Sequence, residues 1–134
     1  MPFPEKLSRI LYIDDDADMR MLVKSTLENT GDMHVTICDS AMEMLETAIE
    51  HKPQMIVLDV MMPVMNGREV LKEIRNDPRI AHVPVIFLTA QDSPGEVKEL
   101  LASGVSGLIH KPFDLVKLPD QIRDLWKKTP PISS

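Results

Sequence analysis

The chain has 134 residues, of which 43% are apolar and 27% are charged. This is the size and composition of one globular domain. Its formal net charge of −6 makes the domain a poor candidate for non-specific nucleic-acid binding, which requires a basic surface. We therefore expect no direct nucleic-acid binding by this domain.

The chain shows no sign of secretion or of membrane insertion. Its first residues, MPFPEKLSR, lack the apolar segment of a signal peptide, and no apolar run is long enough to cross a bilayer. Its single cysteine, Cys38, lies in an apolar stretch and is expected to be a small buried residue rather than a reactive thiol. We expect a cytoplasmic protein that makes no contact with membranes.

In the first half of the chain, short apolar runs alternate with longer amphipathic segments. A strand is predicted over 9–13 and a helix over 17–29, in which an apolar stripe lies on one side. A second strand over 34–38 precedes a helix over 41–51, where Ser40 and Glu43 form a capping box. A third strand over 55–58 leads through the loop MMPVMNG to a helix over 68–76. The stripe of the first helix consists of Met19, Leu22, Val23 and Leu27.

The second half of the chain continues this alternation. A strand is predicted over 84–88, and Ser93 and Glu96 then cap a helix that has Pro94 at its first position and ends near 103–104. A short strand over 107–110 follows. The last helix is expected to begin near Leu118, with Pro119 in its first turn, because proline is poorly tolerated deep in a helix.

The predicted strands are continuous apolar runs, which is typical of a parallel sheet covered on both faces by helices. We therefore predict an α/β fold with a five-stranded parallel sheet flanked by five helices. It should be doubly wound and flavodoxin-like, with strand order 2-1-3-4-5. One domain is expected over 1–134, with its core at about 8–128 and a flexible tail at 129–134. The initial methionine and short tail favour a stand-alone protein over a piece of a longer one.

Chemically useful side chains follow four of the predicted strands, at the point where each strand ends. In chain order they are Asp14, Asp15 and Asp16; Asp59; Thr89; and Lys111. The carboxyl ends of parallel strands meet at one edge of the sheet, which is where such sheets bind ligands. We therefore expect these side chains to lie close together.

Such a group of side chains has a definite electrostatic requirement. Carboxylates a few ångströms apart repel one another unless a positive charge offsets them. Mg²⁺ suits a site with few carboxylates, water and a phosphate oxygen. Lys111 offers an ammonium group for a further phosphate oxygen, and Thr89 offers a hydroxyl. A carboxylate nucleophile, a metal, a lysine and a hydroxyl make a minimal phosphoryl-transfer site.

Each of these groups also has an ordinary structural explanation when it is taken alone. An acidic triplet is more often a solvated loop and helix cap, and Asp59 could be a turn residue before Pro63. Thr89 could be a strand-end hydroxyl, and Lys111-Pro112 an ordinary loop. The combination at four strand ends, in this order, is far more specific than any one of its parts.

Four stretches, ILYIDDDADMR, IVLDVMMPVMNG, VIFLTA and IHKPF, resemble the receiver domain of bacterial response regulators, including the small single-domain chemotaxis regulator. The resemblance covers about residues 8–128. It implies a two-component switch that accepts a phosphoryl group from a histidine kinase or phosphotransfer protein. Phosphorylation would then change the surface that a downstream protein partner recognises. The resemblance implies a switch that promotes its own phosphorylation and dephosphorylation, not a turnover enzyme.

The resemblance also assigns the metal site. The implied Mg²⁺ ligands are the side chains of Asp14, Asp15 and Asp59 and the backbone carbonyl of Met61. Asp59 is at the same time the implied phosphoacceptor. The first two aspartates are preferred to Asp16 because the basic residue that the family often has then falls at Arg20.

Further roles are implied around the phosphoacceptor. Thr89 resembles the hydroxyl that turns toward the phosphoryl group, Lys111 resembles the lysine that pairs with it, and the Lys111-Pro112 peptide bond is expected to be cis. The side chains of Met61 and Gln91 are implied to flank the path of the hydrolytic water. Because a methionine cannot orient water, we expect slow self-dephosphorylation.

One position departs from the family pattern. Where the family often has tyrosine or phenylalanine, three residues before Lys111, this chain has Leu108. Thr89 can still move, but an aromatic swing coupled to it cannot occur at a leucine. This argues against an output surface that depends on a tyrosine hydroxyl.

Three other classes of protein compete with this interpretation. An aspartate-nucleophile phosphatase needs a second aspartate two residues after the nucleophile, where this chain has Met61. A nucleotide-binding module would have a glycine-rich loop after the first strand, where this chain has three acids. A pseudo-receiver that only binds partner proteins should have lost Asp59, Lys111 or the acidic pair; it is the alternative that we keep.

Overall fold

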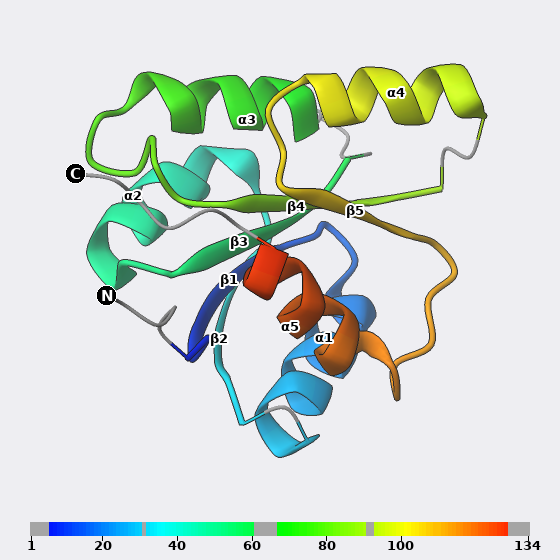
Figure 1. Ribbon diagram of the computed structural model, residues 1–134. Coiled ribbons are helices and arrows are strands. Elements are labelled where there is room, and N and C mark those ends of the chain that lie inside the picture. The colour runs from blue at the N-terminus through cyan, green and yellow to red at the C-terminus, as the bar shows by residue number, and fades with distance from the viewer. Residues whose placement is uncertain (1–5, 31, 61–66, 91–92, 129–134) are drawn as a thin grey trace.

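The computed structural model describes residues 6–30, 32–60, 67–90 and 93–128, apart from the side chains at 41 and 42. Five parallel strands form one sheet in these ranges, in the order β2-β1-β3-β4-β5 (Figure 1). The strands are β1 (Arg9–Ile13), β2 (His34–Cys38), β3 (Met55–Asp59), β4 (Val85–Thr89) and β5 (Gly107–His110). The helices are α1 (Ala17–Thr30), α2 (Ala41–His51), α3 (Gly67–Asn76), α4 (Pro94–Ala102) and α5 (Leu118–Lys128). The predicted fold class and strand order are confirmed.

Helices cover both faces of the sheet, as Figure 1 shows with α3 and α4 above it and α1 and α5 below. Alternate residues of each strand enter two separate apolar clusters. One cluster joins the sheet to α2, α3 and α4, and its largest members from the sheet include Leu11, Ile13, Ile56, Leu58 and Phe87. The other joins the sheet to α1 and α5 and includes Ile10, Tyr12, Met55, Ile86 and Leu88. This double burial explains why the strands are apolar throughout.

Most predicted boundaries are confirmed to within one residue. Ser40 and Ser93 each accept a hydrogen bond from the backbone N–H three residues later, so both predicted N-caps are present. β3 and β4 extend one residue further than predicted, because Asp59 pairs with Leu88 and Thr89 pairs with His110. The chemically important ends of these strands therefore belong to the backbone ladder of the sheet.

The predicted apolar stripe of α1 is partly wrong. Val23 and Leu27 are fully buried and Met19 packs against the same cluster, but Leu22 is 49% exposed. Residues 19, 23 and 27 follow a spacing of four, whereas Leu22 lies at the edge of that stripe and faces solvent. Cys38 is buried as predicted, and burial raises the pKa of its thiol. Among the helices of the described ranges, none has both the length and the apolar character that a bilayer span requires.

The start of α3 approaches the end of β3 very closely. The N–H of Gly67 donates to the carbonyl oxygen of Val60 at 2.8 Å. A Cβ at Gly67 would lie 2.9 Å from the Cα of Val60 and 3.4 Å from the carbonyl oxygen of Asp59. These are backbone atoms, which cannot rotate out of the way as a flexible side chain can. Glycine at position 67 is therefore a requirement for placing Asp59 beside α3.

We predict that Gly67→Ala lowers the free energy of unfolding by about 1–3 kcal/mol, because the added methyl group pushes apart α3 and the end of β3. Urea unfolding measures this change. Gly95→Ala is the matched control: nothing lies within 4 Å of a Cβ at that position of α4, so this variant should be as stable as wild type or more stable. A Gly67→Ala protein with wild-type stability would show that the close approach does not constrain the fold.

Candidate functional site

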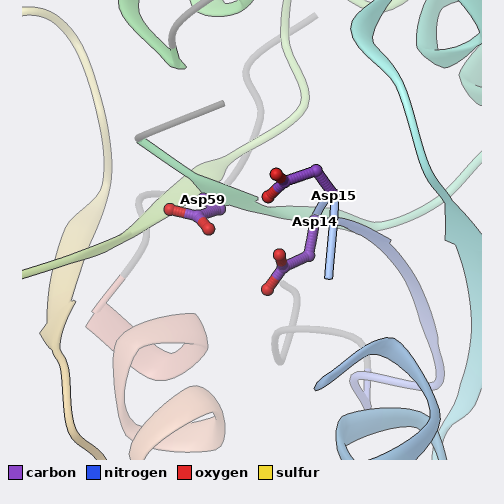
Figure 2. Close-up of side chains that lie close together, drawn as sticks. All are labelled: Asp14, Asp15 and Asp59. Carbon is purple, nitrogen blue, oxygen red and sulfur yellow. The ribbon is translucent and has the colours of Figure 1, made fainter. Parts of the chain in front are cut away.

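Three carboxylates gather where β1 and β3 end. One oxygen from each of Asp14, Asp15 and Asp59 lies within 4.8 Å of the others, and Figure 2 shows the three side chains grouped at these strand ends. The cause is the register of the sheet: Ile13 of β1 pairs with Leu58 of β3, so the next residues, Asp14 and Asp59, lie side by side. Asp14 and Asp59 are buried, at 1% and 4% exposure, and Asp15 is exposed.

Asp14 is held by hydrogen bonds at every polar atom of its carboxylate. The hydroxyl of Tyr12 donates to Oδ2 at 2.5 Å, and the N–H of Asp16 donates to Oδ1 at 2.9 Å. The Arg20 guanidinium donates to the backbone carbonyl of Asp14 at 2.7 Å. Burial, and next the hydrogen bond to Asp14, raise the pKa of the Tyr12 hydroxyl far above its usual value. The hydroxyl therefore stays protonated and donates to the carboxylate.

The side chain of Asp16 makes different contacts from those of Asp14 and Asp15. Its Oδ1 accepts hydrogen bonds from the backbone N–H groups of Asp18 and Met19, at 3.0 and 3.2 Å. These are N–H groups that the first turn of a helix leaves without an intrahelical partner. Asp16 thus caps the start of α1, while Asp14 and Asp15 belong to the carboxylate group. The choice of Asp14 and Asp15 over Asp16 as cation ligands stays a prediction.

Lys111 supplies a positive charge to the group. Its ammonium Nζ lies 2.8 Å from Oδ2 of Asp59, and the side chains are 28% and 6% exposed, respectively. The backbone N–H of Lys111 donates to the carbonyl oxygen of Thr89 at 2.8 Å. This hydrogen bond ties the segment that carries the lysine to the end of β4. The Lys111-Pro112 peptide bond is cis, as the resemblance implies.

Of the remaining predicted site residues, the structure describes three and leaves two outside the described ranges. Thr89 is 1% exposed at the end of β4. Leu108 pairs with Phe87 and packs against the cluster on the α4 side of the sheet, while Pro112 is exposed on the loop after β5. Met61 and Gln91 lie outside the described residues, so their predicted roles stay predictions.

One residue of this site was missed in the sequence. Tyr12 lies in β1, two positions before Asp14, which directly follows the strand. Side chains two positions apart along a strand point to the same face. A hydroxyl two positions before the first acid of a strand end was therefore a usable signal. Whether the hydroxyl reaches the carboxylate depends on how the ring packs, which the strand pattern does not give.

The donor set suits a hard divalent cation. Mg²⁺ is bound in proteins by one or two carboxylates together with water and phosphate oxygens, and three carboxylates here have oxygens within 4.8 Å of one another. The Lys111 ammonium, 2.8 Å from Oδ2 of Asp59, adds a positive charge next to this carboxylate. A carboxylate beside an ammonium group is chemically suited to act as a nucleophile, because the ammonium offsets negative charge on the group that it attacks.

Comparison with known proteins gives one consistent answer. Residues 10–123 match the family model described as the response regulator receiver domain. The chain is 33% identical over 116 residues to the response regulator Rre1 of Synechocystis. The aligned region covers 87% of this chain and 50% of that protein. It is 31% identical over 123 residues to the chemotaxis protein CheY-3 of Vibrio cholerae, and the aligned region covers 92% of this chain and 95% of that protein.

A solved structure shows the same architecture. The chemotaxis response regulator CheY4 of Vibrio cholerae superimposes with a TM-score of 0.81 at 29% identity, covering 90% of this chain and 99% of that one. The chain spans about half the length of Rre1 and nearly all of CheY-3. Sequence, topology and the carboxylate group at the strand ends agree, and the chain belongs to the receiver-domain family of two-component response regulators.

Proposed function

We propose that this receiver domain is a phosphoacceptor switch, in which Asp59 accepts a phosphoryl group from a histidine kinase or phosphotransfer protein in the presence of Mg²⁺. One observation carries the proposal: Asp59 lies within 4.8 Å of two other carboxylates and also forms an ion pair with Lys111 at 2.8 Å. Asp14, Asp15 and Asp59 would hold the cation, with the carbonyl of Met61 as a further ligand implied by the family resemblance.

The transfer step follows from the placement of these groups. A carboxylate oxygen of Asp59 attacks the phosphorus in line, the new P–O bond forms, and the P–N bond to the donor imidazole breaks with its electron pair returning to the nitrogen. When bound, Mg²⁺ offsets negative charge on the carboxylates and on the phosphoryl oxygens. The Lys111 ammonium, which lies 2.8 Å from Asp59, would bind a phosphoryl oxygen as charge redistributes.

Phosphorylation changes the electrostatic balance of the sheet edge. It adds a charge of about −1.5 to −2 beside Asp59, which draws the ammonium of Lys111 and the hydroxyl of Thr89 toward the new group. Lys111 and Thr89 are joined by a backbone hydrogen bond, so their movement transmits the change to the ends of β4 and β5. The face formed by α4, β5 and α5 would then shift between two states that a downstream protein distinguishes.

Leu108 sets a limit on this output. It is packed against the apolar cluster on the α4 side and has no hydroxyl to expose or bury. We propose that the switch works through displacement of Thr89 and the β4–β5 backbone. The protein would act as a stoichiometric switch in the cytoplasm, not as a turnover enzyme, and it promotes only its own phosphorylation and dephosphorylation.

Incubation of the full chain with a small phosphodonor such as acetyl phosphate should give a single phosphoryl adduct that requires Mg²⁺. Intact-mass spectrometry with and without Mg²⁺ detects it. Asp59→Asn should give no adduct because the nucleophilic carboxylate is gone. Asp124→Asn, which alters an exposed aspartate of α5, should behave like wild type. No adduct on folded wild-type protein would favour a pseudo-receiver that only binds partner proteins.

Self-dephosphorylation should be slow, because the side chain of Met61 cannot orient a water molecule for attack on the phosphoryl group. The phosphoprotein, once freed of donor, should lose its adduct over minutes or longer in intact-mass spectra. Met61→Asn should accelerate the loss, since an amide can hold a water, while Met65→Asn serves as the control. Loss of the wild-type adduct within seconds would contradict this expectation.

A further inference from the structure

Tyr12 is a fully buried tyrosine whose hydroxyl ends at the carboxylate group. It lies in β1, a strand with neighbours on both sides, and its backbone is in register with Ile37 of β2 and Val57 of β3. Its side chain is 0% exposed and belongs to the apolar cluster under α1 and α5. Its hydroxyl donates to Oδ2 of Asp14 at 2.5 Å.

We propose that Tyr12 is a positioning residue of the metal site, whose hydroxyl fixes the plane of the Asp14 carboxylate and thereby sets the affinity of the site for Mg²⁺. The inference rests on the proposed function, because it assumes that the carboxylate group binds this cation. Tyr12 would act through the Asp14 carboxylate and would not itself touch the cation.

Two hydrogen bonds hold the Asp14 carboxylate, one on each oxygen. A carboxylate that is held through one oxygen has only a single hydrogen bond to oppose rotation about its Cβ–Cγ bond. The N–H of Asp16 holds Oδ1 at 2.9 Å and the Tyr12 hydroxyl holds Oδ2 at 2.5 Å, so the two donors together fix the plane. Because each carboxylate oxygen can accept more than one partner, both oxygens keep capacity for the cation or for a water bound to it.

The Tyr12 side chain is held in place by the surrounding core. A tyrosine has two side-chain torsions, and this ring is enclosed by the cluster that contains Val23 and Leu27 of α1 and Leu118 and Ile122 of α5. Because the side chain is fully buried, a large movement of the hydroxyl would disturb the packing of this cluster. The position of the Tyr12 hydroxyl is therefore set by the core of the protein. The Asp15 side chain, in contrast, is exposed and is not held by the core.

A simpler explanation competes with this role. A buried tyrosine hydroxyl needs a hydrogen-bond partner, and a nearby carboxylate supplies one. In that case, loss of the hydroxyl would lower stability and leave Mg²⁺ affinity unchanged. Groups that orient a metal ligand instead change metal affinity, by about 10- to 100-fold when they are removed. Metal affinity and stability, measured separately, distinguish the two explanations.

The first experiment is a titration of the full chain with MgCl₂, followed by amide chemical shifts in ¹H–¹⁵N NMR spectra. Tyr12→Phe should bind Mg²⁺ about 10-fold more weakly than wild type. Ile10→Val is the matched control, since it also trims a buried residue of β1 on the same face but lies four positions before Asp14. Its Mg²⁺ affinity should equal that of wild type even if its thermal unfolding midpoint falls.

A second experiment does not depend on a stable variant. The chain contains one tyrosine, so 3-fluorotyrosine labels position 12 alone. Its ¹⁹F resonance should shift during the MgCl₂ titration and give the same dissociation constant as the amides near Asp14. An unchanged ¹⁹F resonance at saturating Mg²⁺ would overturn the proposed role.

These outcomes are separable from the fate of the proposed function. If wild type accepts a phosphoryl group on Asp59 and Tyr12→Phe binds Mg²⁺ as tightly as wild type, the role of Tyr12 is wrong and the switch stands. If wild type binds Mg²⁺ and accepts no phosphoryl group, the switch is wrong, and a 10-fold loss of affinity in Tyr12→Phe still supports the role of Tyr12. Wild type that binds no Mg²⁺ overturns both.

Discussion

The mutual repulsion of three carboxylates is the constraint on which the rest of this site depends. Asp14, Asp15 and Asp59 have oxygens within 4.8 Å of one another, and two of the three side chains are buried. At such distances like charges in a partly buried site repel strongly. The structure offsets this repulsion locally with the ammonium of Lys111, the hydroxyl of Tyr12 and the N–H of Asp16. A site of this kind favours a divalent cation, at a cost to the stability of the cation-free protein.

The fold holds the charged groups together through the ladder of the sheet and the packing beside it. Asp59 and Thr89 are the last residues of β3 and β4, and their backbone partners are Leu88 and His110. Gly67 lets α3 begin directly against the end of β3. Hydrogen bonds and close packing join these elements, and we propose that a charge change at Asp59 is transmitted through them along the neighbouring strands. This coupling is the physical basis on which we propose a switch.

Much of the fold and of the site could be predicted because both follow from parallel strands. Apolar runs bounded by acids, glycine and proline located the strands, and parallel order then brought the strand-end residues to one edge. The rest depends on packing. Leu22 is exposed because α1 buries residues that are four positions apart, and Leu22 is not one of them. Asp16 differs from the two acids before it because its side chain caps α1. The Tyr12–Asp14 contact depends on how the ring is enclosed, which no local pattern encodes.

Urea unfolding of wild type and Asp15→Asn, each with and without Mg²⁺, measures whether repulsion among the carboxylates destabilises the cation-free protein. Asp15 is exposed, so its replacement removes a charge with little loss of packing. Without Mg²⁺, Asp15→Asn should be more stable than wild type because one source of repulsion is gone. Mg²⁺ should stabilise wild type, since it binds only the folded state, and should stabilise the variant much less. A variant that is less stable than wild type without Mg²⁺, and that gains as much from Mg²⁺, would contradict the account.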